Sequence, residues 1–339
     1  MHVLILGAAG MIGRKLTERL VADTRLVADT SLVADTSLGR RAIERMTLID
    51  IVVPQVPAYA PFPVAAEACD LAAPGAAERM LAGKPDLIFH LAAIVSGEAE
   101  ADFDKGLRIN LDGTRHLLDA IRSEMAGHPP RVVFTSSIAV FGAPFPDAIP
   151  DSFQHTPLTS YGTQKAICEL LLADYSRRGF LDGIGIRLPT ICVRPGKPNK
   201  AASGFFSGII REPLNGEDAL LPVGEDVRHW HASPRSAVGF LIHAATIDTS
   251  SFGNRRNLTM PGLSVTVAEQ IASLRRVAGD RVAARIRREP DAAIARIVEG
   301  WPRNFDAARA EKLGFKLVER NFDDIIRFHI DDELAGRLS

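Results

Sequence analysis

A tyrosine and a lysine four positions apart, Tyr161 and Lys165, are the side chains of this chain best suited to move a proton. On a helix this spacing puts both on one face, one turn apart. A phenol holds its proton to about pH 10, and a fixed ammonium favours the phenolate, so we expect Lys165 to lower the pKa of Tyr161. Upstream, Ser136 and Ser137 could hold a substrate hydroxyl against the phenol. The same spacing is common on solvated helix faces, so the surrounding elements must decide between the two interpretations.

A glycine-rich turn near the N-terminus predicts a dinucleotide-binding site. Residues 3–6 form an apolar run typical of a buried parallel strand, and a helical pattern starts at residue 14. Between them, Gly7 allows a tight turn, Gly10 lets the backbone approach a pyrophosphate, and Gly13 lets the helix pack closely on the strand. An ordinary strand-to-helix turn is the alternative, and glycines at these three places directly after a strand make it less favoured.

An acid at the end of the second strand should bind the adenosine ribose, about 20 residues beyond the turn. The candidate, Asp50, lies 37 residues after Gly13, but the hexapeptide LVADT(R/S) occurs three times over residues 20–37. If two copies, 12 residues in all, are left out, Asp50 lies 25 residues after Gly13. On a helix, successive copies would turn their leucines by about 240°, which leaves no single apolar stripe. We therefore expect the repeat to form a surface excursion between the first helix and the second strand.

The composition is that of an α/β protein with ample apolar residues for a large core. The chain has 339 residues, 46% of them hydrophobic, and a net charge of −1, which favours neither a nucleic-acid nor a membrane partner. Three widely spaced cysteines indicate a reducing compartment rather than a disulfide framework. The nine histidines show no metal-binding set. We expect a cytoplasmic protein without a metal site.

Apolar runs and helical patterns alternate along the first half of the chain. Runs at 86–93, 131–136 and 183–188 alternate with helical patterns at 110–121 and 160–178. Such alternation predicts a Rossmann-type, doubly wound parallel sheet, with ligands beyond the carboxyl ends of its strands. The expected organisation is an NAD-binding domain over residues 1–193 and a smaller C-terminal substrate-binding lobe over 194–339, with residues 236–247 returning to the first domain.

Motifs along nearly the whole chain resemble those of the extended short-chain dehydrogenases/reductases, which include nucleotide-sugar epimerases and dehydratases. They are GAAGMIG from Gly7, Asp70-Leu71, HLAA from His90, NLDGT from Asn110, TSSIAVFG from Thr135 and YGTQK from Tyr161. The resemblance implies that Ser137, Tyr161 and Lys165 are catalytic, with Tyr161 as base and Lys165 also binding the nicotinamide ribose. It implies contacts to the cofactor from Gly7, Gly10, Met11, Ile12, Gly13, Asp50, Asp70, Leu71, Leu91, Ala92, Ala93, Asn110, Tyr161, Lys165, Pro189 and Ile191.

Departures from the family pattern narrow the reaction. Related dehydratases carry Asp-Glu after the position of Ser137, where this chain has Ile138 and Ala139, which cannot transfer protons. Dehydration is therefore disfavoured. Asp50 favours NAD as the cofactor over NADP, because its charge would repel a 2′-phosphate, although Arg40 and Arg41 precede it.

Stretches starting at His90, Leu188, Ser203 and Arg228 resemble members of this superfamily that act on small sugar acids. That resemblance implies NAD-dependent oxidation of a secondary hydroxyl of a short sugar acid such as D-erythronate. The small anionic substrate would meet Ser96, Ser137, Arg228 and Arg194, with Arg228 as the first choice for the anion and Arg211 and Arg235 as further cations.

Two other functions stay open at this point: a nucleotide-sugar epimerase with tightly bound NAD, and a non-catalytic NAD-sensing protein. A complete set of Ser137, Tyr161 and Lys165 argues against the sensor, which has no need of it. Helices beginning near Glu98 and Ser160 resemble those that pair in homodimers of the family, and the sequence leaves pairing open.

Overall fold

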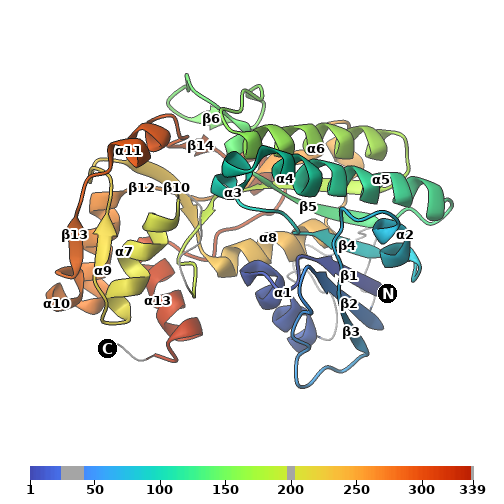
Figure 1. Ribbon diagram of the computed structural model, residues 1–339, viewed down its shortest axis with the longest axis horizontal. Helices are drawn as coiled ribbons and strands as arrows, with labels where there is room; N and C mark the ends of the chain where they lie inside the picture. The colour runs from blue at the N-terminus through green and yellow to red at the C-terminus, as the bar shows by residue number, and fades with distance from the viewer. Residues whose placement is uncertain (24–41, 197–202, 337–339) are drawn as a thin grey trace.

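A seven-stranded parallel sheet forms the centre of the larger lobe in the computed structural model (Figure 1). The structure describes residues 1–23, 42–196 and 203–336. The strand order is β11-β7-β5-β4-β1-β2-β3, and every neighbouring pair is parallel. This is the Rossmann-type, doubly wound arrangement predicted from the alternation of apolar runs and helical patterns. The strands are β1 (His2–Leu6), β2 (Arg45–Asp50), β3 (Val64–Ala68), β4 (Leu87–His90), β5 (Arg131–Ser137), β7 (Asp182–Leu188) and β11 (Asn257–Thr259).

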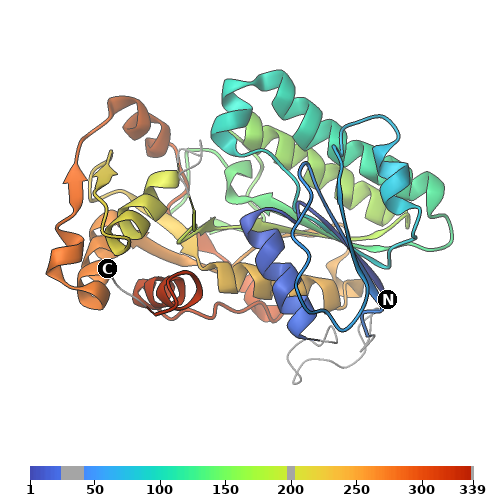
Figure 2. The ribbon, with the colours of Figure 1, turned by 60° about the horizontal axis from the view of Figure 1, so that its bottom comes forward.

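Helices cover both faces of this sheet, because its central strands are apolar on both sides (Figure 2). In β1, Val3 and Ile5 point to the face covered by α1 (Met11–Ala22) and α8 (Pro234–Thr246). Leu4 and Leu6 point to the opposite face, which is covered by α2 (Ala76–Leu81), α5 (Gly113–Glu124) and α6 (Ser160–Arg177). Side chains alternate along a strand, so one apolar run supplies both cores.

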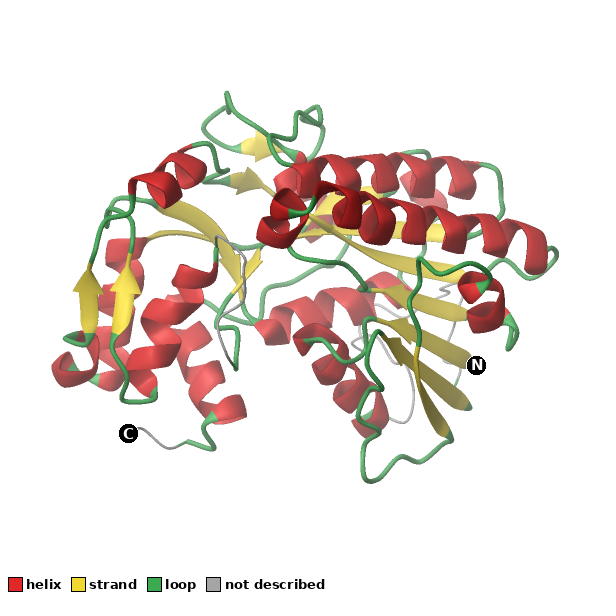
Figure 3. Cartoon of the chain, viewed as in Figure 1, coloured by secondary structure: helices red, strands yellow, loops and turns green. Residues whose placement is uncertain are grey.

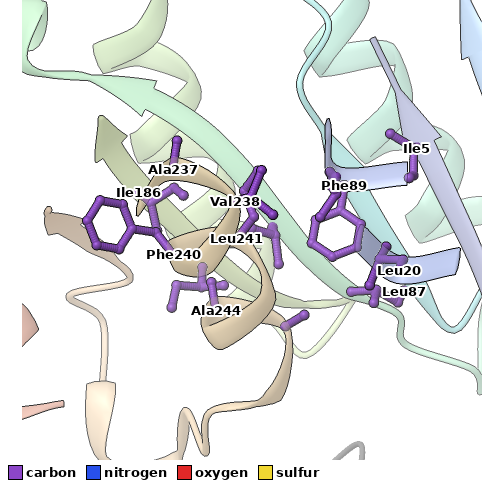
Figure 4. Packing of buried hydrophobic residues seen from close by; sticks show 14 of the residues in the cluster. Ile5, Leu20, Leu87, Phe89, Ile186, Ala237, Val238, Phe240, Leu241 and Ala244 are labelled. Atoms are coloured by element: carbon purple, nitrogen blue, oxygen red, sulfur yellow. The ribbon is translucent and has the colours of Figure 1, made fainter. Parts of the chain in front are cut away.

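Helix α8 comes from the C-terminal part of the chain but packs into the core of the sheet domain. Val238 and Leu241 of α8 lie in one apolar cluster with Ile5, Phe89 and Ile186 of the strands (Figure 4). Strand β11 also extends the sheet from this part of the chain. The chain therefore crosses between the lobes more than once, and the boundary placed at residues 193 and 194 stays a prediction.

The smaller lobe is a group of helices with two short sheets and a core of its own (Figures 1 and 3). Its elements are α7 (Gly204–Leu214), β9 (Ala219–Leu221), α9 (Val267–Ala278), α10 (Asp280–Ala283), β13 (Ile286–Arg288), α11 (Ala292–Glu299) and α13 (Phe322–Glu333). The three-stranded sheet of β12 (Leu263–Thr266), β10 (Arg228–Ala232) and β8 (Thr190–Ile191) joins the lobes, because β8 follows β7 almost directly. An ion pair from Lys15 on α1 to Glu333 on α13 adds a second link.

The helix predicted at 110–121 differs from the observed one. Helix α4 (Phe103–Gly106) runs through a π-helical turn, Leu107–Asp112, into α5, so Asn110 lies inside a wider helical turn rather than at a helix start. Such turns are often found at functional sites. The remaining short elements are α3 (Ser96–Ala101), the 3₁₀ turns Ile138–Val140 and Ser250–Phe252, β6 (Ile149–Pro150), β14 (Phe305–Asp306) and α12 (Ala308–Lys312).

Only the start of the hexapeptide repeat falls within the described residues. The final turn of α1 contains Leu20 and Ala22 of the first copy, and Leu20 is buried in the core. The second and third copies, and with them the predicted surface excursion, lie outside the described residues. Over the ranges that are described, no helix combines the length and the apolar character needed to span a membrane.

Candidate active site

The turn between β1 and α1 is so tight that two of its glycines cannot carry a side chain. Gly7 has a φ of +88°, and a Cβ there would lie 2.7 Å from the backbone nitrogen of Ala92. At Gly13 a Cβ would lie 2.2 Å from the carbonyl oxygen of Gly7. No side chain caps α1 at Gly10, so its first backbone N–H groups are free to bind an anion. Met11 and Ile12 start the helix and are half-buried against the core. This geometry fits the pyrophosphate of a dinucleotide.

Two acids at strand ends flank this turn. Asp50 closes β2, and its carboxylate accepts hydrogen bonds from Ala9 N (2.9 Å) and Ile51 N (2.7 Å), which hold it beside the glycine turn. Asp70 accepts one from Ala72 N and pairs with Arg108 at 2.7 Å. Burial alone would raise the pKa of Asp70, but these two partners outweigh it and lower that pKa. Leu71 follows and packs against the α2–α5 side of the core. The lowered pKa keeps Asp70 ionised at neutral pH.

Tyr161 lies in the first turn of α6, where several contacts position it. Thr159 caps the helix by accepting a hydrogen bond from Gly162 N at 3.0 Å, and Ser160 N donates to Glu100 of α3 at 2.9 Å. Burial raises the pKa of Tyr161 to about 12, while a hydrogen bond with Ser137 and the charge of Arg194 lower it in part. The predicted lowering of the Tyr161 pKa is therefore not found, because desolvation of the phenol is the larger effect and raises that pKa.

Lys165 lies near the Tyr161 ring, as the helical spacing predicted, but it is buried and its ammonium donates to the backbone. The Nζ atom donates to Thr135 O at 2.8 Å and lies 5.8 Å from the centre of the Tyr161 ring. Burial lowers the pKa of Lys165 to about 8, against the opposing effects of Cys168 and Glu169. The ammonium therefore remains mostly protonated at neutral pH. It has donors left for a second partner such as a ribose hydroxyl.

The two serines at the end of β5 have different roles. Ser137 is the last residue of the strand, and its hydroxyl contacts the Tyr161 phenol and accepts a hydrogen bond from Ala139 N at 3.1 Å. Ser136 points into the interior and donates to Glu169 at 2.5 Å. Glu169 in turn pairs with Arg187. Side chains alternate along a strand, so Ser136 is structural and cannot support the substrate hydroxyl as predicted.

The loop after β4 forms the opposite wall of the cofactor site. Leu91 and Ala92 are half-buried beside the Gly7 turn, and Ala93 is exposed. The buried side chain of Asn110 holds Ile94 by accepting from its N–H at 2.9 Å, and it donates to Gln164 of α6 at 2.8 Å. Its amide is thus used within the protein, where Asn110 positions the loop and helix α6, and its predicted contact with the cofactor stays a prediction.

The remaining predicted residues lie at the carboxyl edge of the sheet. Ser96 starts α3 and is half-buried. Pro189 is buried directly after β7, and Ile191 in β8 belongs to the sheet core. Among the described residues no group of three or more His, Cys, Asp or Glu side chains could hold a metal ion. Cys69, Cys168 and Cys192 are free.

Of the four predicted substrate cations, Arg194 and Arg211 line one small pocket, whereas Arg228 and Arg235 lie elsewhere. The charge of Arg194 reaches Tyr161 and lowers its pKa, and no described residue forms a hydrogen bond or ion pair with its guanidinium. The Arg228 guanidinium donates to Ser264 O at 2.7 Å and lies 3.4 Å from Glu269, at the far end of β10 from the site. Arg235 binds Asp332 on α13. The geometry therefore favours Arg194, and not Arg228, as the cation beside the reacting group.

Thr190 and His229 were not among the predicted site residues of this region. Thr190 lines a small pocket between β8 and the start of α7, together with Arg194, Ser207 and Arg211. The Thr190 hydroxyl forms a hydrogen bond with His229. The only sequence signal was the position of Thr190 just beyond a strand end. A hollow of about 890 Å³ between α1, α8 and α13 is lined by none of Ser137, Tyr161 and Lys165 and is separate from the site.

This fold and this site define an NAD-dependent enzyme of the short-chain dehydrogenase/reductase type. Residues 3–237 match the NAD dependent epimerase/dehydratase family, and the chain belongs to that family, as its motifs predicted. It is 48% identical to a D-erythronate dehydrogenase of Cupriavidus necator over 98% of both chains. It is 41% identical to a D-erythronate dehydrogenase of Haemophilus influenzae, over 98% of this chain and all of the relative.

Solved structures agree with this assignment. The crystal structure of the nucleoside-diphosphate-sugar epimerase from Agrobacterium tumefaciens has a TM-score of 0.92 and 64% identity and covers 100% of this chain and 96% of its own. An L-threonine dehydrogenase from Cupriavidus necator has a TM-score of 0.80 at 21% identity, which shows the shared fold alone.

Proposed function

We propose that this protein is an NAD-dependent dehydrogenase that oxidises a secondary hydroxyl of a short sugar acid such as D-erythronate. The observation that carries the proposal is the position of Arg194, whose charge acts on the Tyr161 phenol and whose guanidinium has no partner among the described residues. A cation beside the reacting group suits a substrate whose carboxylate lies only a few bonds from the hydroxyl to be oxidised. The two relatives named D-erythronate dehydrogenase support this choice.

The glycine turn of Gly7 and Gly13, the N-terminus of α1 and Asp50 would hold NAD, which accepts the hydride when bound. Ser137 orients the reacting hydroxyl against Tyr161. Tyr161 as phenolate takes the hydroxyl proton while the C–H bond electrons leave with the hydride, so the substrate ends as a carbonyl. Lys165, held by Thr135 O, keeps a positive charge near the phenolate. A cationic nicotinamide would add to this charge and offset the burial that raises the Tyr161 pKa.

The alternative is a nucleotide-sugar epimerase, the function named for the 64% identical protein from Agrobacterium tumefaciens. A nucleotide sugar carries its charged phosphates far from the reacting carbon and would need a cation some distance from Tyr161. Arg228 is the retained family residue for that place, but Ser264 O and Glu269 already bind its guanidinium. A sensor without turnover has no use for the Ser137–Tyr161 contact.

Purified protein with NAD and either four-carbon sugar acids or nucleotide sugars, followed at the NADH absorbance band, tests the proposal. We expect NADH with D-erythronate. No NADH from any acid, together with interconversion of a nucleotide sugar, would overturn it.

Tyr161→Phe should abolish NADH formation while leaving NAD binding within a few-fold, because only the phenol hydroxyl is lost. Tyr175→Phe on the same helix is the matched control, since the Tyr175 hydroxyl bonds Asp119 away from the site. An active Tyr161→Phe enzyme would rule out the proton shuttle.

We propose further that the protein acts in the cytoplasm and pairs through its α3–α4 and α6 surface into a homodimer. Exposed apolar side chains on that surface, Phe103 at 58% and Leu170 at 65%, support pairing. The molecular mass in solution, compared between the native chain and Leu170→Glu, tests it. A native monomer would contradict the pairing.

A further inference from the structure

Thr190 lies where a small substrate bound between Ser137 and Arg194 would be close to it. Leu188 of β7 pairs with Ser137 in the sheet, and Thr190 is two residues further along the chain. Its half-buried side chain lines the pocket that contains Arg194 and Ser207. A hydroxyl at this place can contact the substrate, and the direction of its hydrogen bond decides which groups it accepts.

That direction is set by His229, which is buried behind Thr190. His229 is 3% exposed. Its ring lies parallel to that of Phe206, with ring centres 5.2 Å apart. Its Nδ1 atom is 2.9 Å from Pro302 O. A carbonyl oxygen can only accept, so Nδ1 carries the ring proton. Burial also lowers the pKa of His229 to about 4, so the ring is neutral at physiological pH and Nε2 carries a lone pair.

The Thr190 hydroxyl must therefore give its proton to His229. The Oγ1 atom of Thr190 lies 2.7 Å from Nε2 of His229, which can only accept. With its proton used, Thr190 presents lone pairs alone to the pocket. It can receive a hydrogen bond from a substrate hydroxyl, and it offers nothing to a carbonyl or ether oxygen. A substrate ammonium would also donate, but the charge of Arg194 beside the pocket opposes a cation.

We infer that Thr190 is a specificity-determining residue that accepts a hydrogen bond from a second hydroxyl of the substrate, and that His229 is the positioning residue that fixes its direction. The inference rests on the proposed function and narrows the substrate class to acids with a further hydroxyl beside the reacting one. Singly hydroxylated acids, and acids with a carbonyl at the second position, would be poor substrates.

The test uses D-erythronate and the analogues of it that each lack one hydroxyl, with the native enzyme, Thr190→Val, Thr190→Ser and Thr246→Val. Valine keeps the shape of threonine without its hydroxyl, and serine restores the hydroxyl. Thr246 is a control threonine at the end of α8, buried away from the pocket, where its hydroxyl bonds Ile242 O and His243 O of its own helix. The analogue without the reacting hydroxyl gives no NADH and identifies the oxidised position.

For Thr190→Val we expect KM for D-erythronate to rise at least about 10-fold with kcat changed little, because a hydrogen bond made in both ground and transition states is lost. With the native enzyme, the analogue that lacks the hydroxyl bound by Thr190 should show the same rise in KM relative to D-erythronate. With Thr190→Val, that analogue and D-erythronate should have similar KM values. Thr190→Ser should restore most of the affinity, and Thr246→Val should match the native enzyme. A valine variant that still discriminates against every deoxy analogue as the native enzyme does would overturn the inference.

His229→Phe, which keeps the stacking on Phe206, tests the positioning role. It should raise KM in the native background and have no added effect in the Thr190→Val background; equal effects in both would show a merely structural role. A native enzyme without activity on any sugar acid would instead refute the proposed function, so the two failures are distinguishable.

Discussion

At the scale of single residues, the pattern of residue types predicted which groups gather at the site but not the environment of each group. Ser137 and Ser136 have the same chemistry and adjacent positions, yet strand alternation sends one to Tyr161 and the other to Glu169. Arg228 was favoured by a family motif, and the structure commits it to Ser264 O. Partners from distant parts of the chain decide these outcomes, and spacing along the sequence does not reveal them.

The two serines predict separable defects. Ser137→Ala should lower kcat by about 100-fold, because a donor aimed at the reacting oxygen is lost. Ser136→Ala should keep kcat within a few-fold but lower the free energy of unfolding by about 1–3 kcal/mol, because the buried Glu169 carboxylate loses a hydrogen bond. Steady-state kinetics and urea unfolding of both variants check this. A Ser136→Ala enzyme with the larger loss of kcat would reverse the assignment.

Arg194 predicts a shift in the dependence of activity on pH. Its charge lowers the pKa of Tyr161, so Arg194→Gln removes that effect and moves the pKa upward. Tyr161 must lose its proton to act as base, so activity falls as pH falls through the apparent pKa, and the variant should need a higher pH for half-maximal kcat. Profiles of kcat against pH, measured at saturating concentrations of the sugar-acid substrate, separate this effect from weaker substrate binding. Arg228→Gln is the comparison variant. If the pH of half-maximal kcat rose in Arg228→Gln and not in Arg194→Gln, Arg228 would be the cation that acts on Tyr161.

At the scale of elements, predictability followed the strength of the apolar signal. β1, β4, β5 and β7 were anticipated because buried parallel strands are continuous apolar runs. β3 has the sequence Val-Ala-Ala-Glu-Ala at the edge of the sheet and is mostly exposed, so no apolar run marks it. β11 is only three residues long and is a strand because it pairs with β7, which lies some 70 residues earlier in the chain. The π-helical turn at Asn110 depends on side-chain contacts to Ile94 and Gln164.

The turn from β1 to α1 predicts a sharp contrast between two glycines. Gly13→Ala would place a Cβ 2.2 Å from Gly7 O and 2.7 Å from Ala8 Cα, so backbone must move. We expect a stability loss of about 1–3 kcal/mol and weaker NAD binding. Gly239→Ala on α8 meets open space and should be neutral or stabilising by up to about 1 kcal/mol. Thermal unfolding and NAD titration calorimetry measure both, and a Gly13→Ala protein with native NAD affinity would contradict the pyrophosphate assignment.

At the scale of the whole molecule, both lobes bury neutral histidines. His90 lies in the sheet domain against Thr114, and His229 and His231 lie in the strand that joins the lobes. Burial lowers the pKa of His90 to about 3 and that of His229 to about 4, and it holds the pKa of His231 well below its ordinary value. Each ring is therefore kept neutral in the folded state at a pH where the unfolded chain would protonate it.

This arrangement predicts a protein that loses stability in mild acid. Below the unfolded histidine pKa of about 6.5 the unfolded chain binds protons that the folded protein does not, so stability is greatest above that pH and falls as pH drops toward 4. Each such histidine contributes a slope of about 1.4 kcal/mol per pH unit in that range. Thermal unfolding between pH 7.5 and pH 4.5 measures it. His90→Gln should reduce the slope by the contribution of one proton, about 1.4 kcal/mol per pH unit. A melting temperature that stays constant from pH 6.5 to pH 5 would show that these rings are not held neutral, and the fixed direction of the Thr190 hydroxyl would lose its basis with them.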